Sequence, residues 1–381
     1  MIKEIDVKNK KVFVRVDFNI DLDKDGRILS DFRIRATIPT IQFLLKAGAN
    51  KIILASHLGK PKAKEEEFSL KPIAEYLGIL LGRKIIFLND CIGDGVKKEI
   101  DNAAAGEIFL LENLRFHEEE EKNDDQFAKQ LANLADVYVN DAFGVCHRAN
   151  ASVVAITKFL PSCAGLLLEK EIENLDKVKN NFTQSLILIL GGAKISTKLP
   201  LIKKFSKRSE KILLGGGLAN TVLKARGLNV GKSLFEPELL AEVEKLDDNV
   251  ITPVDCLVGS SVDDKQARIV GIEGVNDNEM ILDIGPSSLD CFIDIIKRAE
   301  TIIWNGPLGY FENAIFAKST EEIIKAISES RAFTVVGGGE TLLALEKVKA
   351  FDKISFVSTG GGAMLSYLSG EEMPGLKVLN Q

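Results

Sequence analysis

Short apolar runs recur along this chain, and most of the gaps between them are long enough for one helix. Residues such as Ile52, Ile53 and Leu54 are apolar on both faces of an extended chain, which is typical of central parallel strands covered by helices on both sides. This alternation predicts the α/β class, with two doubly wound parallel-sheet (Rossmann-like) domains. The predicted strands are 11–16, 51–55, 84–88, 107–111 and 136–139 in the first half, and 186–190, 211–214, 301–304, 332–336 and 353–357 in the second.

A long helical pattern crosses the middle of the chain at 162–179 and changes from apolar to charged and amphipathic along its length. We expect a hinge helix here that joins the two domains, because a shared helix is stiffer than a Gly/Ser linker and restricts relative motion to a hinge. The predicted N-terminal domain covers 1–168, with the C-terminal tail 370–381 packed back on it. The predicted C-terminal domain covers 169–369.

Several local signals refine this pattern in the second half of the chain. The sequence Ser-Thr-Glu-Glu at 319–322 predicts a capping box at the start of a helix. Pro237 and Pro286 suit first helical positions, where a missing N–H costs nothing. Residues 260–284 indicate β excursions and turns outside the repeating pattern, and we assign them no function.

Composition and charge restrict the possible partners. With 381 residues and 45% apolar content, the chain can bury two large cores. Its net charge of -6 argues against a nucleic-acid or membrane-surface partner, since both need an extended basic field. The five cysteines are scattered and form no C-x-x-C pair, which favours a reducing cytoplasm over a disulfide framework or a zinc cluster. No signal-peptide core and no membrane-length apolar run is found.

Glycine-rich turns follow several predicted strands in the second half. The turn Ser-Thr-Gly-Gly-Gly-Ala at 358–363 lies between a predicted strand and a predicted helix. Without a Cβ, its backbone N–H groups can close on phosphate oxygens at the positive end of the following helix. One such turn is more often a packing device. Its repetition at 191–192, 215–217, 305–309 and 337–339 favours a phosphate site.

The first half offers arginines and other polar residues where its predicted strands end. Arg33, Arg115 and Arg148 are candidates for binding a phosphate and a carboxylate, because a guanidinium group grips an oxyanion with two hydrogen bonds. Each arginine taken alone could instead pair with a nearby acid such as Asp31 or Asp141. The histidines at 57, 117 and 147 have no metal-ligand spacing, so we expect hydrogen-bonding or structural roles for them.

Several catalytic motifs are missing from the sequence. It has no P-loop, no H-R-D with D-F-G, no G-x-S-x-G, and no defensible Ser/His/Asp or Cys/His set. A kinase without a general base suits an acceptor that is already an anion, such as a carboxylate, because no proton has to be removed. This reasoning narrows the expected chemistry toward acyl phosphates.

The ordered motifs resemble those of the phosphoglycerate kinase family over nearly the whole chain. That resemblance implies reversible phosphoryl transfer between 1,3-bisphosphoglycerate and ADP in glycolysis, by direct in-line transfer on domain closure, with Mg²⁺ as cofactor. The matching motifs are RVDFN at 15–19, SDFRIR at 30–35, SHLGKP at 56–61, LLENLRF at 110–116, VNDAFGVCHRANAS at 139–152, GGAKISTK at 191–198, DIGP at 283–286, WNGPLGYFE at 304–312, GGGET at 337–341 and STGGGA at 358–363.

The resemblance also implies a role for each matching residue. The residues implied for 3-phosphoglycerate are Asp17, Asn19, Arg33, His57, Leu58, Gly59, Lys60, Arg115 and Arg148. Those implied for the nucleotide are Lys198, Gly215, Gly216, Glu312, Gly338, Gly339, Glu340 and Thr341, with Glu340 also toward the metal. Those implied to act on the transferring group are Arg33, Lys194, Gly338 and Gly361.

The sequence departs from the family pattern at four positions. Lys60 stands where the family usually has Arg, Glu340 where it has Asp, Asn150 where it has His, and Ser366 where it often has an acid. The change at 60 weakens a bidentate grip, and the change at 340 alters the metal geometry by one methylene. No charge that the reaction needs is lost.

Three functional hypotheses remain open at this point. The first is a monomeric cytoplasmic phosphoglycerate kinase with small molecules as its partners. The second is a degenerate relative that serves as a nucleotide-binding or interaction module, which the retained Arg33, Lys194 and Lys198 disfavour. The third keeps acyl-phosphate chemistry but uses another small carboxylate as acceptor. An assay of 3-phosphoglycerate-dependent ATP consumption separates them.

Overall fold

The structure is a computed structural model that describes residues 2–23, 26–180 and 185–379. Its internal contacts divide the chain into two compact units. The first unit comprises Met1–Glu173 and Glu371–Gln381, and the second comprises Asn174–Gly370. The division falls within helix α5 (Leu166–Asn180), whereas the sequence places the boundary between residues 168 and 169.

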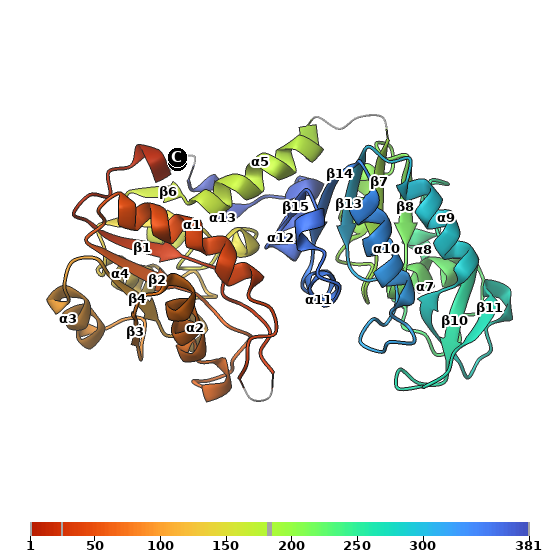
Figure 1. Cartoon of the computed structure of the whole chain (residues 1–381), viewed down its shortest axis with the longest axis horizontal. Coiled ribbons are helices and arrows are strands. Elements are labelled where there is room, and N and C mark those ends of the chain that lie inside the picture. Colours follow the sequence, from red (N-terminus) through yellow and green to blue (C-terminus); the bar gives the residue numbers. More distant parts are fainter. Residues whose placement is uncertain (1, 24–25, 181–184, 380–381) are drawn as a thin grey trace. The chain divides into compact units, whose positions relative to one another are not determined.

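The first unit is built on a six-stranded parallel sheet in the order β3-β4-β2-β1-β5-β6 (Figure 1). Neighbouring residues of one strand point to opposite faces, so that Val12 packs with α1 and α2 whereas Phe13 packs with α3 and α4. The strands are β1 (Lys11–Arg15), β2 (Lys51–Ala55), β3 (Ile85–Leu88), β4 (Glu107–Leu111), β5 (Val137–Asn140) and β6 (Ser162–Ala164). The helices are α1 (Phe32–Lys46), α2 (Lys71–Leu81), α3 (Asp94–Asn102) and α4 (Asp125–Ala132).

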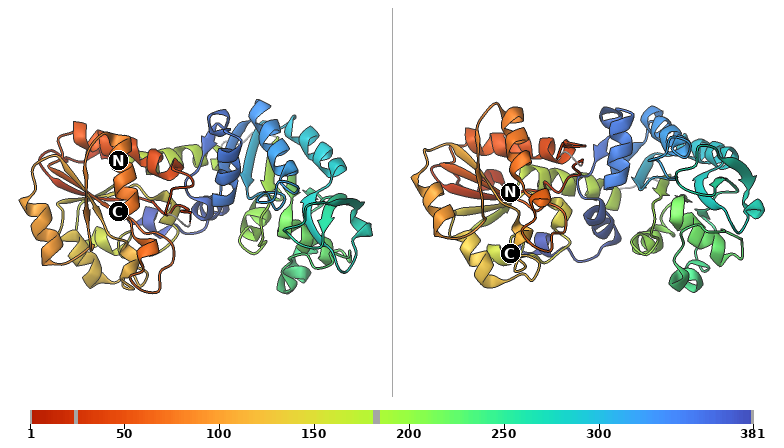
Figure 2. Two further views of the ribbon diagram at one scale, coloured as in Figure 1. Left: turned by 60° about the horizontal axis from the view of Figure 1, so that its bottom comes forward. Right: turned by 90° about the horizontal axis from the view of Figure 1, so that it is seen from below.

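The C-terminal tail belongs to this first unit. Helix α13 (Pro374–Lys377) lies against it, where the Gly375 N–H donates to the Cys146 carbonyl oxygen at 2.9 Å. Figure 2 shows α13 beside the yellow segments of this unit.

The second unit has its own six-stranded parallel sheet, in the order β15-β14-β13-β7-β8-β9. Its strands are β7 (Leu186–Leu190), β8 (Lys211–Leu214), β9 (Val250–Ile251), β13 (Thr301–Asn305), β14 (Phe333–Gly337) and β15 (Phe356–Val357). Its helices are α6 (Leu199–Phe205), α7 (Gly216–Ala225), α8 (Leu240–Val243), α9 (Pro286–Ile296), α10 (Lys318–Glu329), α11 (Gly339–Lys347) and α12 (Gly361–Ser369). The predicted fold of two doubly wound parallel-sheet domains is therefore confirmed.

The β excursions predicted at 260–284 are part of a separate small sheet in the second unit. It is antiparallel, with the strand order β11-β10-β12. Its strands are β10 (Asp255–Gly259), β11 (Arg268–Gly271) and β12 (Met280–Ile284).

Three local predictions need correction. Residues Ser162–Ala164 form edge strand β6 beside β5 and not the start of the long helix, because their backbone pairs with a neighbour that the local pattern does not reveal. The strand predicted at 353–357 shortens to Phe356–Val357 after a 3-10 turn. The capping box is wrong, because α10 already begins at Lys318 and the Ser319 hydroxyl donates to Asp283. Pro286 does open α9, and Pro237 opens a 3-10 turn.

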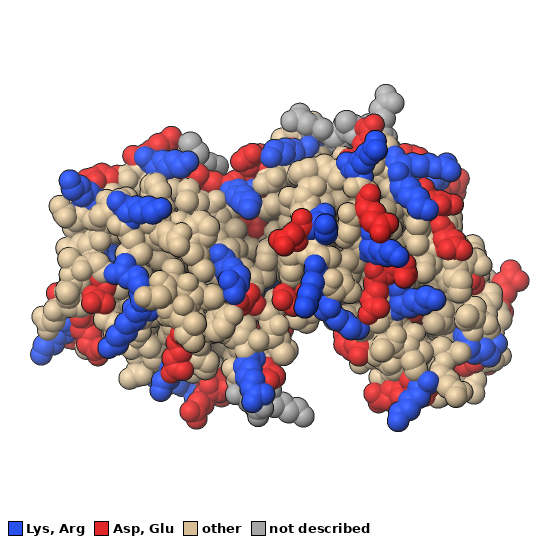
Figure 3. Space-filling view, viewed as in Figure 1, with Lys and Arg blue, Asp and Glu red and all other residues tan. Residues whose placement is uncertain are grey.

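The surface carries charges of both signs. On the face in Figure 3, basic and acidic side chains alternate over both units. Among the described residues, none of the helices has the length and apolarity needed to cross a membrane.

Candidate active site

Asn113 joins the loops that follow β2 and β4 at the carboxyl edge of the first sheet. Its side chain is fully buried and bonds both backbone groups of Leu58, accepting from the N–H at 3.2 Å and donating to the carbonyl at 2.8 Å. Its Oδ1 also accepts from the Arg115 N–H at 3.0 Å. One amide therefore fixes the backbone of two predicted ligand-binding segments relative to each other.

Gly59 connects three of the loops at this edge. Its N–H donates to Asn19 Oδ1 at 2.8 Å, and its carbonyl accepts from an Arg115 guanidinium nitrogen at 2.6 Å. The position requires glycine, because φ is +62° and a Cβ would overlap the Phe68 ring. Arg33 donates to the Asn19 carbonyl from α1. The structure thus brings together Asn19, Arg33, Gly59 and Arg115, four of the residues that the family resemblance implies for 3-phosphoglycerate.

His57 lies in the same group, and its proton can be placed by elimination. Arg15 approaches its Nδ1 at 3.2 Å. A guanidinium group has only donors, so Nδ1 accepts and a neutral ring carries its proton on Nε2. Burial lowers the pKa of His57 well below its usual value, and the positive charges of Arg15, Arg115, Arg148 and Arg33 lower it further. His57 is therefore a neutral hydrogen-bond donor in a strongly positive field, with Asp17 Oδ1 3.9 Å from Nδ1.

A buried network behind His57 holds Arg15 in place. Arg15 Nε donates to the Ser152 hydroxyl at 2.9 Å, and that hydroxyl donates to Glu120 at 2.6 Å. Glu120 also accepts from the Ser152 N–H at 2.9 Å. All three residues are at most 1% exposed. Sequence reasoning missed these residues, although a charged residue at the end of the apolar run at 11–16 is a signal for Arg15.

The two acids that the sequence offered as alternative partners for the arginines, Asp31 and Asp141, form hydrogen bonds with other groups. Asp31 accepts from Arg35 at 2.7 Å and from the Tyr76 hydroxyl at 2.5 Å, while Asp141 accepts from backbone N–H groups of α5. Arg115 does pair with an acid, Glu121, at 3.1 Å.

The remaining predicted residues of the first unit differ in exposure. Burial lowers the pKa of Arg115, and Glu121 opposes that shift. Arg148 and Lys60 are exposed, and Arg148 Nε donates to His147 at 3.1 Å. Leu58 is buried.

In the second unit, the glycine turns pack directly against one another. The Gly192 N–H donates to the Pro307 carbonyl at 2.8 Å, and the Gly216 N–H donates to the Leu308 carbonyl at 2.9 Å. A Cβ on Gly361 would lie 2.6 Å from Gly338 Cα, so these two turns touch backbone to backbone. Close packing therefore requires glycine here, and it also places the N-terminal ends of α7, α11 and α12 in adjoining turns.

A cation and a carboxylate flank one of these turns. A Cβ atom added to Gly192 would lie 3.5 Å from Lys198 Nζ and 3.6 Å from Glu340 Oε2. Burial lowers the pKa of Lys198, while the charges of Glu340 and Glu236 oppose that shift. Glu340 is exposed in the first turn of α11. These two predicted residues are thus close together beside a glycine turn.

The other predicted residues of the second unit are placed less closely. The Thr341 hydroxyl accepts from the Gly306 N–H at 2.7 Å. Lys194 is exposed on the loop after β7. Glu312 is exposed after β13.

A narrow pocket opens beside Gly216 that the sequence did not predict. Asn220 contributes a buried side chain to it. Among the described residues, Asn220 Oδ1 has no hydrogen-bond partner. The pocket is otherwise mostly apolar, with lining residues that include Ala219, Leu223, Ile281, Leu282 and Leu308. These residues come from a helix, the small sheet and a loop, so no local pattern could have grouped them.

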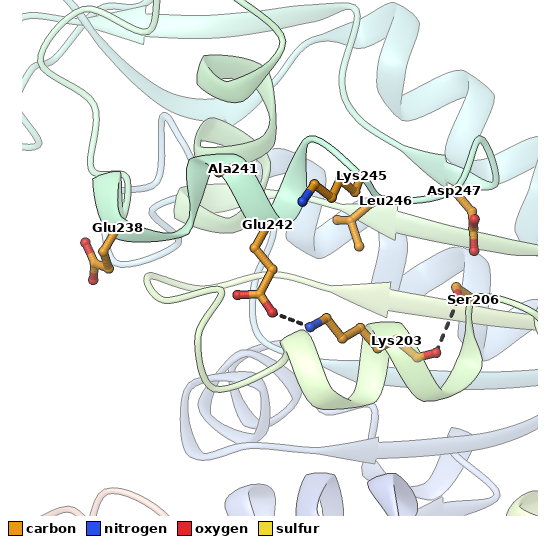
Figure 4. A pocket seen from close by; sticks show the side chains of 8 residues that line it. All are labelled: Lys203, Ser206, Glu238, Ala241, Glu242, Lys245, Leu246 and Asp247. Carbon is orange, nitrogen blue, oxygen red and sulfur yellow. Dashed lines mark hydrogen bonds and ion pairs between the residues drawn. The ribbon is translucent and has the colours of Figure 1, made fainter.

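A larger cavity of about 500 Å³ lies elsewhere in the second unit, along α6 and α8 (Figure 4). Its lining includes the ion pair between Lys203 and Glu242. It contains none of the residues predicted for ligand binding, so we do not place the active site there.

The first unit thus presents cations and a neutral donor suited to an oxyanion, and the second presents glycine-lined helix N-termini with a lysine and a carboxylate suited to nucleotide phosphates. These features are typical of a nucleotide-dependent phosphotransferase. The family model described as "Phosphoglycerate kinase" matches residues 2–371, and the chain belongs to this family. It is therefore a kinase of glycolysis, and the predicted enzyme class is confirmed.

Individual relatives agree with this assignment. The chain is 46% identical to the phosphoglycerate kinase of Geobacter metallireducens over 385 residues, covering 98% of this chain and 96% of the relative. It is 44% identical to that of Moorella thermoacetica, covering 100% and 98%. The solved structure from Coxiella burnetii matches with a TM-score of 0.83 at 36% identity, and that from Pyrococcus horikoshii OT3 with 0.89 at 33%. Both cover 100% of this chain and 98% of the other.

Proposed function

We propose that the first unit binds 3-phosphoglycerate through Asn19, Arg33, His57, Arg115 and Arg148. The observation that carries this proposal is geometric: Gly59 bonds both Asn19 and Arg115, and Arg33 donates to the Asn19 carbonyl. Beside them lies His57, whose pKa is lowered first by burial and then by the positive charges of four arginines. So much positive charge around a neutral donor favours an anionic ligand with several oxygens. The His57 Nε2–H and the guanidinium groups would donate to its phosphate and carboxylate oxygens.

The second unit would hold the nucleotide. Helix N-termini that begin at Gly216, Gly339 and Gly361 offer N–H groups to the phosphates, with Lys198 as a nearby cation. The pocket beside Gly216 encloses only about 10 Å³, room for about one water molecule, so we do not place the base inside it.

In direct transfer, the bond-making and bond-breaking take place between the two bound substrates. A carboxylate oxygen of 3-phosphoglycerate attacks the γ-phosphorus of ATP, and the bond from that phosphorus to the ADP oxygen breaks. The reverse reaction forms ATP. Charge spreads over the equatorial oxygens of the group in transit, so fixed cations and N–H groups stabilise it. We assign this role to Arg33, Lys194 and the turns at Gly338 and Gly361.

Glu340 is the residue that would hold Mg²⁺. It offers an exposed carboxylate beside Gly192, and carboxylate oxygen is a ligand that Mg²⁺ prefers. When bound, the ion supplies positive charge to the nucleotide phosphates. Glu340 itself would orient that charge from the first turn of α11.

A coupled assay tests the proposed function. ATP consumption by the purified chain should depend on both Mg²⁺ and 3-phosphoglycerate. Nucleotide binding without turnover would instead support a degenerate binding module, and turnover only with another small carboxylate would support a different acceptor.

We further propose that the chain works as a cytoplasmic monomer with small molecules as partners. Its five cysteines are free thiols and its net charge is -6, which suits a reducing compartment and disfavours nucleic acid. Sedimentation at working concentrations would test the monomeric state, and a dimer would contradict it.

A further inference from the structure

Three side chains with different ligand atoms meet on the first unit, and none of them is among the proposed substrate residues. Asp90 and Cys91 follow β3, and His117 follows the 3-10 turn Leu114–Phe116. One ligand atom from each residue lies within 4.8 Å of the other two. His117 Nε2 is 2.8 Å from Asp90 Oδ1. The sequence predicted no metal ligand among the histidines, because this grouping depends on the fold and not on spacing.

The three atoms form a mixed set of sulfur, nitrogen and oxygen. Zn²⁺ is a borderline-soft cation that accepts all three, whereas Mg²⁺ and Ca²⁺ prefer oxygen alone. With a thiolate, a carboxylate and a neutral imidazole, the ligands carry two negative charges, which balance one divalent cation.

The surroundings restrain the Cys91 and His117 side chains and leave the Asp90 side of the cluster accessible to a cation. Cys91 is 1% exposed and belongs to an apolar core cluster, so its sulfur has little freedom to move. The Phe127 ring lies 5.2 Å from the His117 ring and restricts its orientation. By contrast, the side chains of Asp90 and His117 are 49% and 25% exposed. A cation can therefore enter beside them, and water can complete its coordination.

A simpler explanation is an ordinary ion pair beside a core cysteine. The Cys91 N–H donates to Asp90 Oδ1 at 2.7 Å, so the carboxylate already has two partners. That explanation accounts for Asp90 and His117 as an ion pair and for Cys91 as a small apolar core residue. It gives no reason for three different ligand atoms to lie within 4.8 Å of one another. A cation accounts for all three residues, and it would replace the proton shared by His117 and Asp90.

We propose that Asp90, Cys91 and His117 bind a zinc-like divalent cation, with water as a fourth ligand. This site belongs to the first unit and does not depend on the proposed nucleotide chemistry, in which Glu340 of the second unit would hold Mg²⁺. Three protein ligands with one open position differ from the closed four-ligand coordination of structural zinc sites.

A cobalt titration tests the proposal directly. Full-length protein freed of metal by a chelator, without nucleotide, is titrated with Co²⁺ while the thiolate-to-cobalt charge-transfer absorption is recorded. We expect one Co²⁺ per chain with this absorption, displaced by Zn²⁺ but not by excess Mg²⁺. Cys91→Ser should abolish the absorption. His117→Gln should weaken binding more than about tenfold, since even the outer partners of metal ligands have effects of that size.

Matched controls separate a site from general thiol chemistry. Cys291→Ser removes an exposed cysteine of α9 and should leave the titration unchanged. Because Cys91 lies in the core, thermal unfolding must show that Cys91→Ser folds, and His117→Gln provides an independent, partly exposed variant. Binding without sulfur absorption, equal affinity in His117→Gln, or loss of the signal in Cys291→Ser would each overturn the proposal.

Discussion

His57 illustrates how one candidate ligand-binding residue depends on a buried network of other side chains. Its Nδ1 is occupied by Arg15, and Arg15 is held in turn by Ser152 and Glu120. The imidazole is thereby confined to one tautomer before any ligand arrives. Donors fixed in advance avoid a reorganisation cost during binding and reaction.

The lowered pKa of His57 predicts a specific effect of pH on stability. The unfolded chain takes up a proton at His57 near pH 6.5, whereas the folded chain does so only at lower pH. Its contribution to stability is therefore present above about pH 6.5 and is lost as the pH falls. We expect His57→Gln to remove this loss, so the difference in melting temperature between the two proteins should shift in favour of the variant from pH 8 to pH 5.5. A difference independent of pH would contradict this assignment.

A second prediction for a single residue concerns the kinetic role of Lys194. It is exposed beside the Gly192 turn, and the proposed function assigns it to the group in transit. An interaction made mainly in the transition state affects kcat more than nucleotide affinity. Lys194→Ala should therefore lower kcat by about 10²-fold with little change in the KM for ATP. Lys203→Ala, which removes an ion pair elsewhere in the same unit, should have little effect on either constant. A rise in the KM for ATP alone would show that Lys194 has another role.

At the scale of elements, the N-terminal end of α5 is held by side chains of two other segments of the first unit. The Leu166 N–H donates to the Thr40 hydroxyl at 3.2 Å, and the Leu167 N–H donates to Asp141 Oδ1 at 2.9 Å. Burial raises the pKa of Asp141 to about 7, although its hydrogen bonds to Thr40 and α5 oppose that shift. The start of α5 is thus tied to α1 and to the loop after β5.

This raised pKa predicts a pH effect opposite to that of His57. The folded chain keeps a proton on Asp141 up to about pH 7, whereas the unfolded chain loses it near pH 4. Stability from this group is therefore greatest at low pH and falls as the pH rises toward 7. Asp141→Asn should lack this slope, so its melting temperature relative to the native chain should rise from pH 5 to pH 8. Asp283, whose pKa is also raised to about 7 by burial, is present in both proteins and cancels. Parallel melting curves at all pH values would refute the prediction.

The elements also show what the sequence could predict. Runs such as Ile52, Ile53 and Leu54 identify buried parallel strands, because an element covered on both faces has no polar side. The capping box at Ser319 failed because a buried acid, Asp283, competes for the same hydroxyl. The Arg15 network and the pocket beside Gly216 were not predicted, since their members come from segments far apart in the chain. Local patterns thus indicate elements and anion-binding turns, whereas side-chain networks require the fold.

At the scale of the whole molecule, the proposed ligand sites divide between the two units. The residues assigned to 3-phosphoglycerate belong to the first unit, and those assigned to the nucleotide belong to the second. Direct transfer requires the reacting atoms to lie about 3–3.5 Å apart, and water must be excluded from the group in transit. We therefore predict a closing motion at α5 that needs both ligands, because neither alone interacts with both units.

Solution scattering measures this motion. The radius of gyration should be smaller with 3-phosphoglycerate plus a non-hydrolysable ATP analogue than with either ligand alone. A ligand-free protein that is already as compact as the ternary complex would rule out closure, while the assay of phosphoryl transfer would be unaffected.

The position of the C-terminal tail affects the order in which the protein can be completed on the ribosome. Gly375 fits against Cys146 and Val153 of the first unit so closely that a Cβ would lie 2.6 Å from a Val153 methyl group. The residues that cover this surface are therefore translated after the entire second unit. During synthesis, the second unit is therefore complete before the first unit, although the second unit begins later in the sequence. The surface at Cys146 therefore stays uncovered until Gly375 has been synthesised, so the first unit acquires its last packing contact only after the second unit is complete.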